Sequence, residues 1–419
     1  MAAAVATDFF DARETRDTAA RETALMAALP GLIAAAQRGA PAYAARLAGI
    51  DPATIDSRAA LARLPLTRKS QLMEVQRASP PFGGFTTVPL RDVARVFASP
   101  GPIYEIEARR ADFFRMARAL HAAGFRAGDL VHNTFSYHLT PAGAMLESAA
   151  LALGCPVIPA GTGQTEQQLR TIADLRPVAY VGTPSFLKIL IDRAAEAGSE
   201  ISSLKKAMVG AEAFPAVLRR EFRERGINAL QCYGTADVGL IAYETMTPDG
   251  EVCDGMMLDE GVILELVEPG SGTPVAPGEV GEVVVTTLTP EYPLIRFATG
   301  DLSALLTAPS PCGRTNQRIK GWLGRADQSA KVRGMFVHPL QVGEIARRHP
   351  AVRRARLVIE RPASADMMTL FVETEAPQEA EAIAATAQAV TKLRAAVSCV
   401  APGSLPDDGR LIEDRRPID

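Results

Sequence analysis

Between residues 93 and 226 short apolar segments alternate with amphipathic ones, and this alternation constrains the fold more than any other feature. The expected strands are 93–98, 130–135, 156–160, 178–181 and 206–209, and the expected helices are 111–122, 142–153, 164–175, 185–197 and 215–226. Repeated strand–helix units of this length favour a mostly parallel sheet with helices on both faces. Ligands of such sheets bind beyond the carboxyl ends of the strands.

The regions before and after this alternation show different sequence patterns. Residues 1–75 are Ala-rich and helical in pattern, residues 239–306 are rich in alternating strands, and the region after Gly324 has the pattern of a compact α+β domain. A chain of 419 residues exceeds the usual size of one domain. We therefore predict an α/β protein. Its large N-terminal domain, 1–323, contains doubly wound βα subdomains and a small β-rich subdomain, and a small α+β domain, 324–419, follows.

Composition excludes several classes of protein. The 45 basic and 48 acidic residues are interspersed and give a net charge of -3, which leaves no basic field for nucleic acid. The five cysteines show no CxxC spacing, which argues against a disulfide framework and a zinc module. Asp8 precedes any long apolar run, which argues against a secretory signal peptide. No apolar stretch approaches the ~20 residues that span a bilayer. We expect a soluble, cytoplasmic protein without a membrane partner; the sequence is compatible with a homodimer.

Three motifs follow one another at characteristic spacing. They are residues 233–237 (YGTAD), 296–302 (RFATGDL) and 324–334 (GRADQSAKVRG), preceded by 153–159, 163–166, 183–185 and 210–212. With these motifs the chain resembles the phenylacetate-CoA ligase branch of the adenylate-forming superfamily. The resemblance runs from about Pro65 to the C-terminus. Several separate motifs in the same order make it a specific signal.

The resemblance implies a two-step reaction in which ATP and a carboxylic acid give an acyl-adenylate, and the thiol of coenzyme A then displaces AMP. A small, mobile C-terminal domain rotates between the steps. The nucleotide-binding positions implied are Gly210, Ala211, Glu212, Tyr233 and Gly234 around the adenine, Asp301 on the ribose hydroxyls, Asp237 near the phosphates and Arg325 supporting the nucleotide, with the hinge at Asp327. A carboxylate such as Asp301 can accept two hydroxyl hydrogen bonds at once.

The sequence departs from the family where the triphosphate would bind. The stretch Ser99 to Glu105 carries two prolines and an acid where the family has a hydroxyl-rich loop ending in a lysine. The motif's usual Thr-Glu pair is Ala236-Asp237, so Asp237 is the candidate ligand of Mg²⁺, with a shorter stem.

The tail of the chain shows a second departure. The family's lysine near the C-terminus has no counterpart, because the last lysine is Lys392 and Glu413 lies near the expected place. Lys331, Arg410 and Arg415 are the candidate catalytic cations in its stead. Loss of a preorganised cation is expected to slow adenylation.

The candidate acid-binding residues are Tyr137, His138, Ala142, Gly143 and Ala236. Small residues here favour a flat ring, hence an aryl or arylacetic acid. His138 is either a general base or a packed, hydrogen-bonded residue.

Some relatives hold a structural zinc near residues 243–253 and 309–313, but only Cys253 and Cys312 are present here, so we predict no zinc.

These observations lead to two functional hypotheses. The first is a phenylacetate-CoA ligase-like, AMP-binding enzyme, an acid–thiol ligase whose partners are a small carboxylic acid and a nucleotide. The alternative is a non-ligase homologue that binds AMP, acyl-adenylate or acyl-CoA without making the adenylate from ATP, or that transfers a preformed acyl group.

Overall fold

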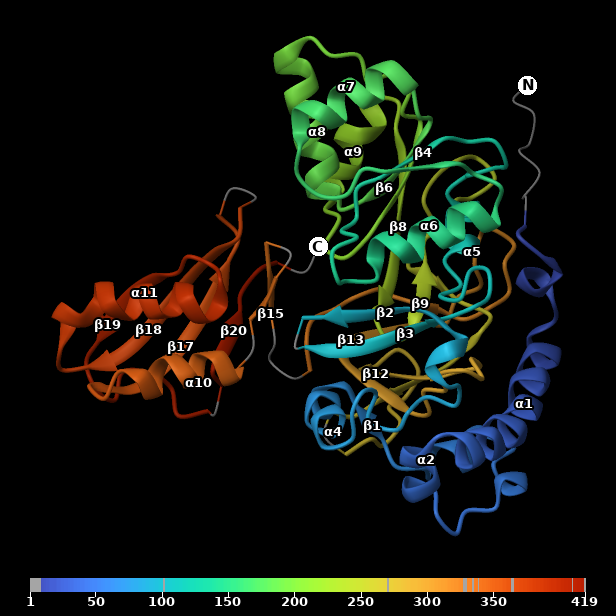
Figure 1. Ribbon diagram of the computed structural model, residues 1–419, viewed down its shortest axis with the longest axis horizontal. Helices are drawn as coiled ribbons and strands as arrows, with labels where there is room; N and C mark the ends of the chain where they lie inside the picture. Colours follow the sequence, from blue (N-terminus) through green and yellow to red (C-terminus); the bar gives the residue numbers. More distant parts are fainter. Residues whose placement is uncertain are drawn as a thin grey trace. The chain divides into compact units, whose positions relative to one another are not determined.

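A computed structural model describes residues 9–100, 102–269, 271–326, 330–333, 335–337, 339–362, 365–408 and 410–417 (Figure 1). The chain divides into two compact units, Met1–Leu323 and Gly324–Asp419. Each unit has its own buried apolar core. No helix in the described ranges has the length and apolar character needed to cross a membrane.

The first unit is built on one large mixed sheet with the strand order β11-β12-β13-β14-β10-β9-β8-β7-β6-β4-β5, and β1 adds to β13. Its parallel half comprises β4 (Val131–Asn133), β5 (Val157–Pro159), β6 (Ala179–Gly182), β7 (Lys206–Val209) and β8 (Asn228–Thr235). Strands β4, β5, β6 and β7 lie where the sequence predicted them, whereas β8 was not predicted as a strand. The strand predicted at 93–98 is β2 (Val93–Ser99), which lies outside this sheet and pairs antiparallel with β3 (Ile103–Ala108). The predicted α/β class is confirmed.

The region of alternating strands does not form a separate sheet. Its strands are β9 (Gly239–Tyr243), β10 (Met256–Leu258), β11 (Val262–Val267), β12 (Val280–Thr287), β13 (Phe297–Leu306) and β14 (Arg318–Ile319). Strand β9 pairs antiparallel with β8, which joins this half to the parallel half. The short strand β1 (Thr67–Arg68) pairs in parallel with the start of β13.

The helices of the first unit cover the sheet. They are α1 (Thr18–Gly39), α2 (Pro41–Arg46), α3 (Arg58–Ala62), α4 (Leu72–Ala78), α5 (Ala117–Ala122), α6 (Ala142–Ala152), α7 (Thr165–Leu175), α8 (Pro184–Ala197) and α9 (Ala216–Glu224). Helices α7, α8 and α9 enclose an apolar cluster of their own with β6 and β7 (Figure 1).

One expectation about these helices is wrong. The helix predicted at 111–122 begins only at Ala117, because Asp112 and Arg115 adopt φ angles of 48° and 63°, which no helix allows. The Asp112 carboxylate accepts a hydrogen bond from the N–H of Ala117 at 3.1 Å instead. Helix α1 continues through Pro30, and its buried residues, including Leu29 and Ile33, pack in the main core.

The second unit is a four-stranded sheet with the order β19-β18-β17-β20, two helices and a hairpin. Its elements are β15 (Ala330–Val332), β16 (Met335–Val337), α10 (Pro339–Arg348), β17 (Val352–Glu360), β18 (Met367–Thr374), α11 (Ala380–Thr391), β19 (Ala396–Val400) and β20 (Ile412–Asp414). The sequence pattern predicted one helix over 376–396. Instead α11 ends before Lys392, whose φ of 63° reverses the chain, and β19 follows.

Candidate active site

Asp301 lies at the centre of the side that the motifs assign to adenosine. It belongs to β13 and is buried, at 5% exposure. The hydroxyl of Tyr233, on β8, donates to one carboxylate oxygen at 2.8 Å, and the indole N–H of Trp322 donates to the other at 3.0 Å. Two donors from separate parts of the first unit therefore fix both oxygens of Asp301 in space.

Trp322 is the residue that sequence reasoning missed. It is the chain's single tryptophan and lies two residues before the Gly324 motif. Its ring is 38% exposed while its N–H reaches a buried carboxylate. A lone tryptophan beside a binding motif was the available signal, since a buried indole N–H usually finds an acceptor.

The loop after β7 carries the next predicted residues. The backbone of Gly210 approaches Cys232 so closely that a Cβ atom would lie 3.2 Å from its sulfur. Ala211 adopts a φ of 69°, and the carboxylate of Glu212 accepts a hydrogen bond from the N–H of Ser185, at the N-terminus of α8, at 2.7 Å. An acidic side chain is favourable at this end of a helix.

The predicted phosphate segment is a hairpin rather than an open loop. Strands β2 (Val93–Ser99) and β3 (Ile103–Ala108) pair as far as Ser99 opposite Ile103. Both strands are tied to the body of the unit. The amide side chain of Gln76 exchanges two hydrogen bonds of 2.8 Å with the backbone of Tyr104, and the N–H of Ala98 donates to Leu139 at 2.9 Å. These bonds use backbone groups that a phosphate-binding loop would offer to its ligand.

Glu105 points into the interior from β3. It is 1% exposed, and the hydroxyl of Ser99 donates to one of its oxygens at 2.5 Å. Burial and the nearby carboxylate of Asp237 raise the pKa of Glu105 to about 8. Among the described residues its second oxygen has no hydrogen-bond partner.

Asp237 also faces this interior. One of its oxygens accepts a hydrogen bond from the ammonium group of Lys69, and its side chain is fully buried. Its other oxygen, and the buried hydroxyl of Tyr292, have no partner in the part of the chain that the structure describes. Burial and the charges of Asp237 and Glu105 raise the pKa of Tyr292 well above its usual value. Sequence reasoning missed Lys69 and Tyr292 because neither lies in a recognised motif.

The predicted magnesium site does not fit this arrangement. Mg²⁺ needs several oxygen ligands in octahedral geometry, usually including water. The ammonium group of Lys69 donates to one oxygen of Asp237. The described residues contain no group of three or more His, Cys, Asp or Glu suited to a metal ion. The assignment of Asp237 to a metal stays a prediction, and the geometry argues against it.

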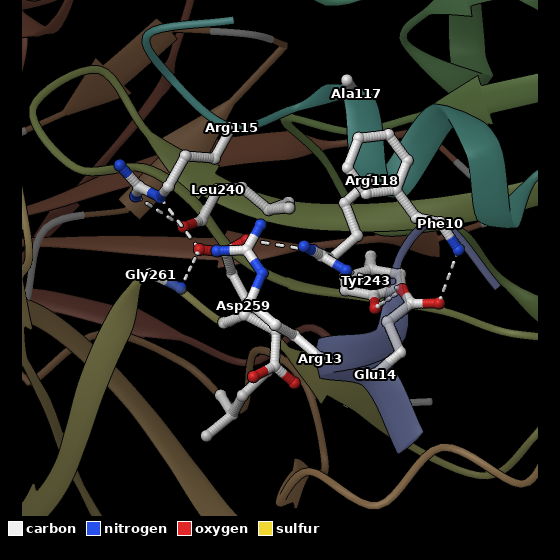
Figure 2. A network of polar contacts seen from close by, with 12 residues as sticks. Phe10, Arg13, Glu14, Arg115, Ala117, Arg118, Leu240, Tyr243, Asp259 and Gly261 are labelled. Carbon is white, nitrogen blue, oxygen red and sulfur yellow. Dashed lines mark hydrogen bonds and ion pairs between the residues drawn. The ribbon is translucent and has the colours of Figure 1, made fainter. Parts of the chain in front are cut away.

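A buried charge network supports the turn that follows Asp237. Figure 2 shows Arg115 and Asp259 directed toward each other; they form an ion pair of 2.9 Å. A second guanidinium nitrogen of Arg115 donates to the carbonyl of Val238 at 2.7 Å. The same network anchors the chain's N-terminal segment, where Glu14 accepts a 2.7 Å hydrogen bond from Tyr243. Arg115 thereby ties the residue that follows Asp237 to the buried carboxylate of Asp259.

Four of the predicted acid-binding residues, 137, 138, 142 and 143, lie at or just before the start of α6, and Ala236 follows β8; Gly143 and the neighbouring motif residue Gly234 leave no open space. A Cβ atom on Gly143 would lie 2.9 Å from the ring of Tyr137, and one on Gly234 would lie 2.5 Å from the carbonyl of Gly239. The Tyr137 hydroxyl accepts a hydrogen bond from the Asn133 amide at 2.8 Å. His138 is exposed, so the alternative of a packed histidine is wrong, and the role of general base stays a prediction. Ala142 begins α6, and Ala236 is half-buried beside Asp237.

The remaining predicted residues lie in the second unit. Arg415 is half-exposed and pairs at 2.9 Å with Glu413 on β20, so its charge is partly neutralised there. Arg410 is exposed. Arg325 is half-buried, and Lys331 lies in β15, whose backbone alone is described at that position. Asp327 lies outside the described residues.

Cys253 and Cys312 lie close together, as a zinc site like that of some relatives would require. The other groups beside them are hydroxyls. Hydroxyl groups of Thr245 and Ser310 lie 3.3 Å and 3.1 Å from the sulfur of Cys312. A hydrogen bond from Cys253 lowers the pKa of Cys312. The set offers two thiols and two hydroxyls, which is not a closed zinc site.

Comparison with known proteins shows what the chain is similar to. The family described as AMP-binding enzyme matches residues 113–289. The phenylacetate-coenzyme A ligase of Thermus thermophilus is 35% identical over 343 residues, which cover 79% of this chain and 76% of that protein. The ligase of Aromatoleum evansii is 33% identical over 80% of this chain and 79% of its own length. A crystal structure of 2-hydroxyisobutyryl-CoA ligase with 2-HIB-AMP and CoA is similar with a TM-score of 0.82 at 27% identity, covering 96% of this chain and 91% of that one.

Proposed function

The chain belongs to the phenylacetate-CoA ligase family of AMP-binding enzymes, and we propose that it joins a small carboxylic acid to coenzyme A through an acyl-adenylate. The observation that carries the proposal is the position of Asp301. Tyr233 and Trp322 hold its carboxylate between them at the motif that binds ribose in the family. A carboxylate already oriented by two donors can accept the ribose hydroxyls without further ordering.

In the proposed first step a carboxylate oxygen of the acid attacks the α-phosphorus of ATP, and pyrophosphate leaves. The thiolate of coenzyme A then attacks the acyl carbonyl, and AMP leaves with the bonding electrons. Tyr233, Gly234 and the loop of Gly210, Ala211 and Glu212 would frame the adenine, and Arg325 would support the nucleotide. Their task is to hold AMP in place through both steps, since positioning is a large part of catalysis.

The charge that develops on the phosphate oxygens needs cations. Lys331, Arg410 and Arg415 are our candidates from the second unit, which would move about a hinge near Asp327 between the two steps. The pairing of Arg415 with Glu413 makes Arg415 the weakest of the three, because its charge is already partly balanced. Lys331 is the candidate to test first.

We propose an aryl or arylacetic acid as substrate, with a small branched acid as the second candidate. The ring of Tyr137 fills the space beside Gly143, and this packing favours a compact acid. The 2-hydroxyisobutyryl-CoA ligase, to which this chain is similar, acts on an acid of that size. A panel of phenylacetate, benzoate and 2-hydroxyisobutyrate separates the two classes.

The test of the function is formation of the CoA thioester and exchange of pyrophosphate into ATP, measured with each acid. We expect both activities with at least one acid in the wild type, and their loss in Asp301→Ala. Asp249→Asn, at an exposed acid outside the motifs, is the control and should behave as the wild type. Absence of thioester with every acid, from ATP and from synthetic acyl-adenylates alike, would rule the ligase out.

One observation favours a second function, transfer of a preformed acyl-adenylate to coenzyme A without use of ATP. The β2–β3 hairpin uses its backbone groups internally, where the family binds the outer phosphates. Such an enzyme would convert synthetic acyl-adenylate and coenzyme A into thioester, and would show no pyrophosphate exchange. The same assays therefore discriminate the two functions.

A further inference from the structure

Cys253 and Cys312 meet in the main core of the first unit, although neither belongs to a nucleotide motif. Cys253 is 4% exposed and Cys312 is fully buried. The thiol of Cys253 donates a hydrogen bond to the sulfur of Cys312, and the N–H of Cys253 donates to the carbonyl of Thr245 at 2.8 Å. The hydroxyls of Thr245 and Ser310 lie 3.3 Å and 3.1 Å from the Cys312 sulfur. Two sulfur atoms and two hydroxyls therefore lie together inside the core.

Zinc does not fit this set of groups. Structural zinc is held by four ligands drawn from cysteine, histidine and carboxylate side chains, and hydroxyls are not among them. Within the described ranges no third residue of those types joins the two cysteines. The guanidinium of Arg314 hydrogen-bonds to Cys312 and also pairs with Glu14 at 3.1 Å. A divalent ion would therefore add positive charge beside a buried cation, which is unfavourable.

A monovalent thiophilic ion fits the same groups. Thiolate sulfur is a soft ligand of the kind that Cu(I) prefers, and Cu(I) is satisfied by two such ligands. The hydrogen bond from Cys253 lowers the pKa of Cys312, which favours the thiolate there. On binding, Cu(I) bonds to both sulfurs and the thiol proton of Cys253 leaves to solvent, with no transfer of electrons. One positive charge replaces another, so the charge of the buried site does not change.

We propose that Cys253 and Cys312 form a two-sulfur site that excludes zinc and accepts a monovalent thiophilic cation, Cu(I). Thr245 and Ser310 orient the sulfurs through their hydroxyls, as hydrogen-bonding partners of metal ligands commonly do. Burial of both cysteines keeps water away from the ion. The inference goes beyond the proposed function, because none of these residues is assigned to the acid, the nucleotide or coenzyme A.

The test is competition for Cu(I) between the protein and the chromogenic chelator bicinchoninate, in the absence of oxygen. The wild type is compared with Cys253→Ser, Cys312→Ser and Cys155→Ser. Cys155 is the matched control, because it is buried and its sulfur donates to the carbonyl of Arg126 at 3.0 Å. We expect one Cu(I) per wild-type chain, an affinity about 100-fold lower or more in the first two variants, and no change in Cys155→Ser. Absence of Cu(I) binding by the wild type, or equal binding by all variants, would overturn the proposal.

Two further measurements test the site if a serine variant does not fold, which circular dichroism reports. X-ray absorption at the copper edge of the wild-type complex should show two sulfur neighbours, and a shell of nitrogen or oxygen ligands would refute the assignment to the cysteines. Zn²⁺, offered in the same competition, should show no binding that depends on Cys312. A zinc ion that the wild type retains and Cys312→Ser loses would contradict the exclusion of zinc. These measurements need no acid, ATP or coenzyme A, so their outcome does not depend on the proposed function.

Discussion

The adenosine side and the phosphate side of this site differ in how their buried carboxylates are satisfied. On the adenosine side both oxygens of Asp301 accept hydrogen bonds, from Tyr233 and Trp322. On the phosphate side Glu105 and Asp237 each keep one buried oxygen without a partner among the described residues. A satisfied carboxylate is preorganised for a ligand. On the phosphate side, by contrast, burial and the charge of Asp237 raise the pKa of Glu105, and Asp237 pairs with Lys69.

The comparison locates the chain's departures from its family. Two of the departures seen in the sequence, at Ser99–Glu105 and at Ala236-Asp237, lie in the first unit, where β3 carries Glu105 inward and Lys69, directly after β1, donates to Asp237. The residues predicted to bind the nucleoside match the family's motifs, whereas those predicted to bind the phosphates differ from them. Variants on each side should therefore fail in different ways.

The largest effect is expected from Asp301→Ala. It removes the proposed acceptor of two ribose hydroxyls and takes from the Tyr233 hydroxyl and the Trp322 N–H the carboxylate to which they donate. Loss of two charge-assisted hydrogen bonds should weaken AMP about 100-fold or more, measured by calorimetry. An AMP affinity within about 3-fold of the wild type would show that Asp301 is a structural carboxylate and would remove the contrast between the two sides.

Glu105→Gln should change how stability depends on pH. The pKa of Glu105 is about 8 in the folded protein and near 4.5 for an ordinary glutamate. The folded state therefore holds the proton more tightly, so this contribution to stability is fully present below about pH 4.5 and is lost as pH rises through 8. The amide introduced by the substitution does not titrate. We expect the variant to gain stability relative to the wild type as pH rises from about 4.5 to about 8, by up to a few kcal/mol in urea unfolding. A stability difference that is independent of pH would contradict the inward, protonated state of Glu105.

Gln76→Ala tests whether the hairpin is held closed. It removes both hydrogen bonds to Tyr104 from a side chain that is 4% exposed. We expect the free energy of unfolding to fall by about 2 kcal/mol, with AMP affinity unchanged. Gln167→Ala, on the exposed face of α7, is the control. If Gln76→Ala lowers AMP affinity as strongly as Asp301→Ala does, the two sides are not independent.

The smallest effect is expected from Trp322→Phe. The variant keeps an aromatic ring and loses one hydrogen bond to Asp301, so AMP should weaken about 3- to 10-fold. Trp322 is also the single tryptophan of the chain, so its fluorescence in the wild type should change on addition of AMP. A fluorescence that AMP leaves unaltered would place Trp322 outside the nucleotide site.

The sequence predicted more of the fold than of the site. Strand β7 and helix α10 lie where the periodicity placed them, because short apolar runs and amphipathic stretches are local signals. The expected start of α5 was wrong because the φ angles of Asp112 and Arg115 depend on what those side chains contact, including Asp259. In the site, motifs predicted Tyr233 and Asp301, but no motif predicted Trp322 or Lys69.

By itself the sequence determined the order of elements, the α/β class and the nucleoside-binding motifs, since each depends on residues that are close together in the chain. Only the tertiary structure decided which groups meet around the buried carboxylate of Asp237. Lys69 and Asp237 are 168 residues apart, and they meet because β1 adds to β13. That pairing depends on the long-range register of a large sheet, which local periodicity does not specify. Glu105 lies on β3, which pairs with β2 in a separate two-stranded sheet, and it brings a second buried carboxyl group close to Asp237.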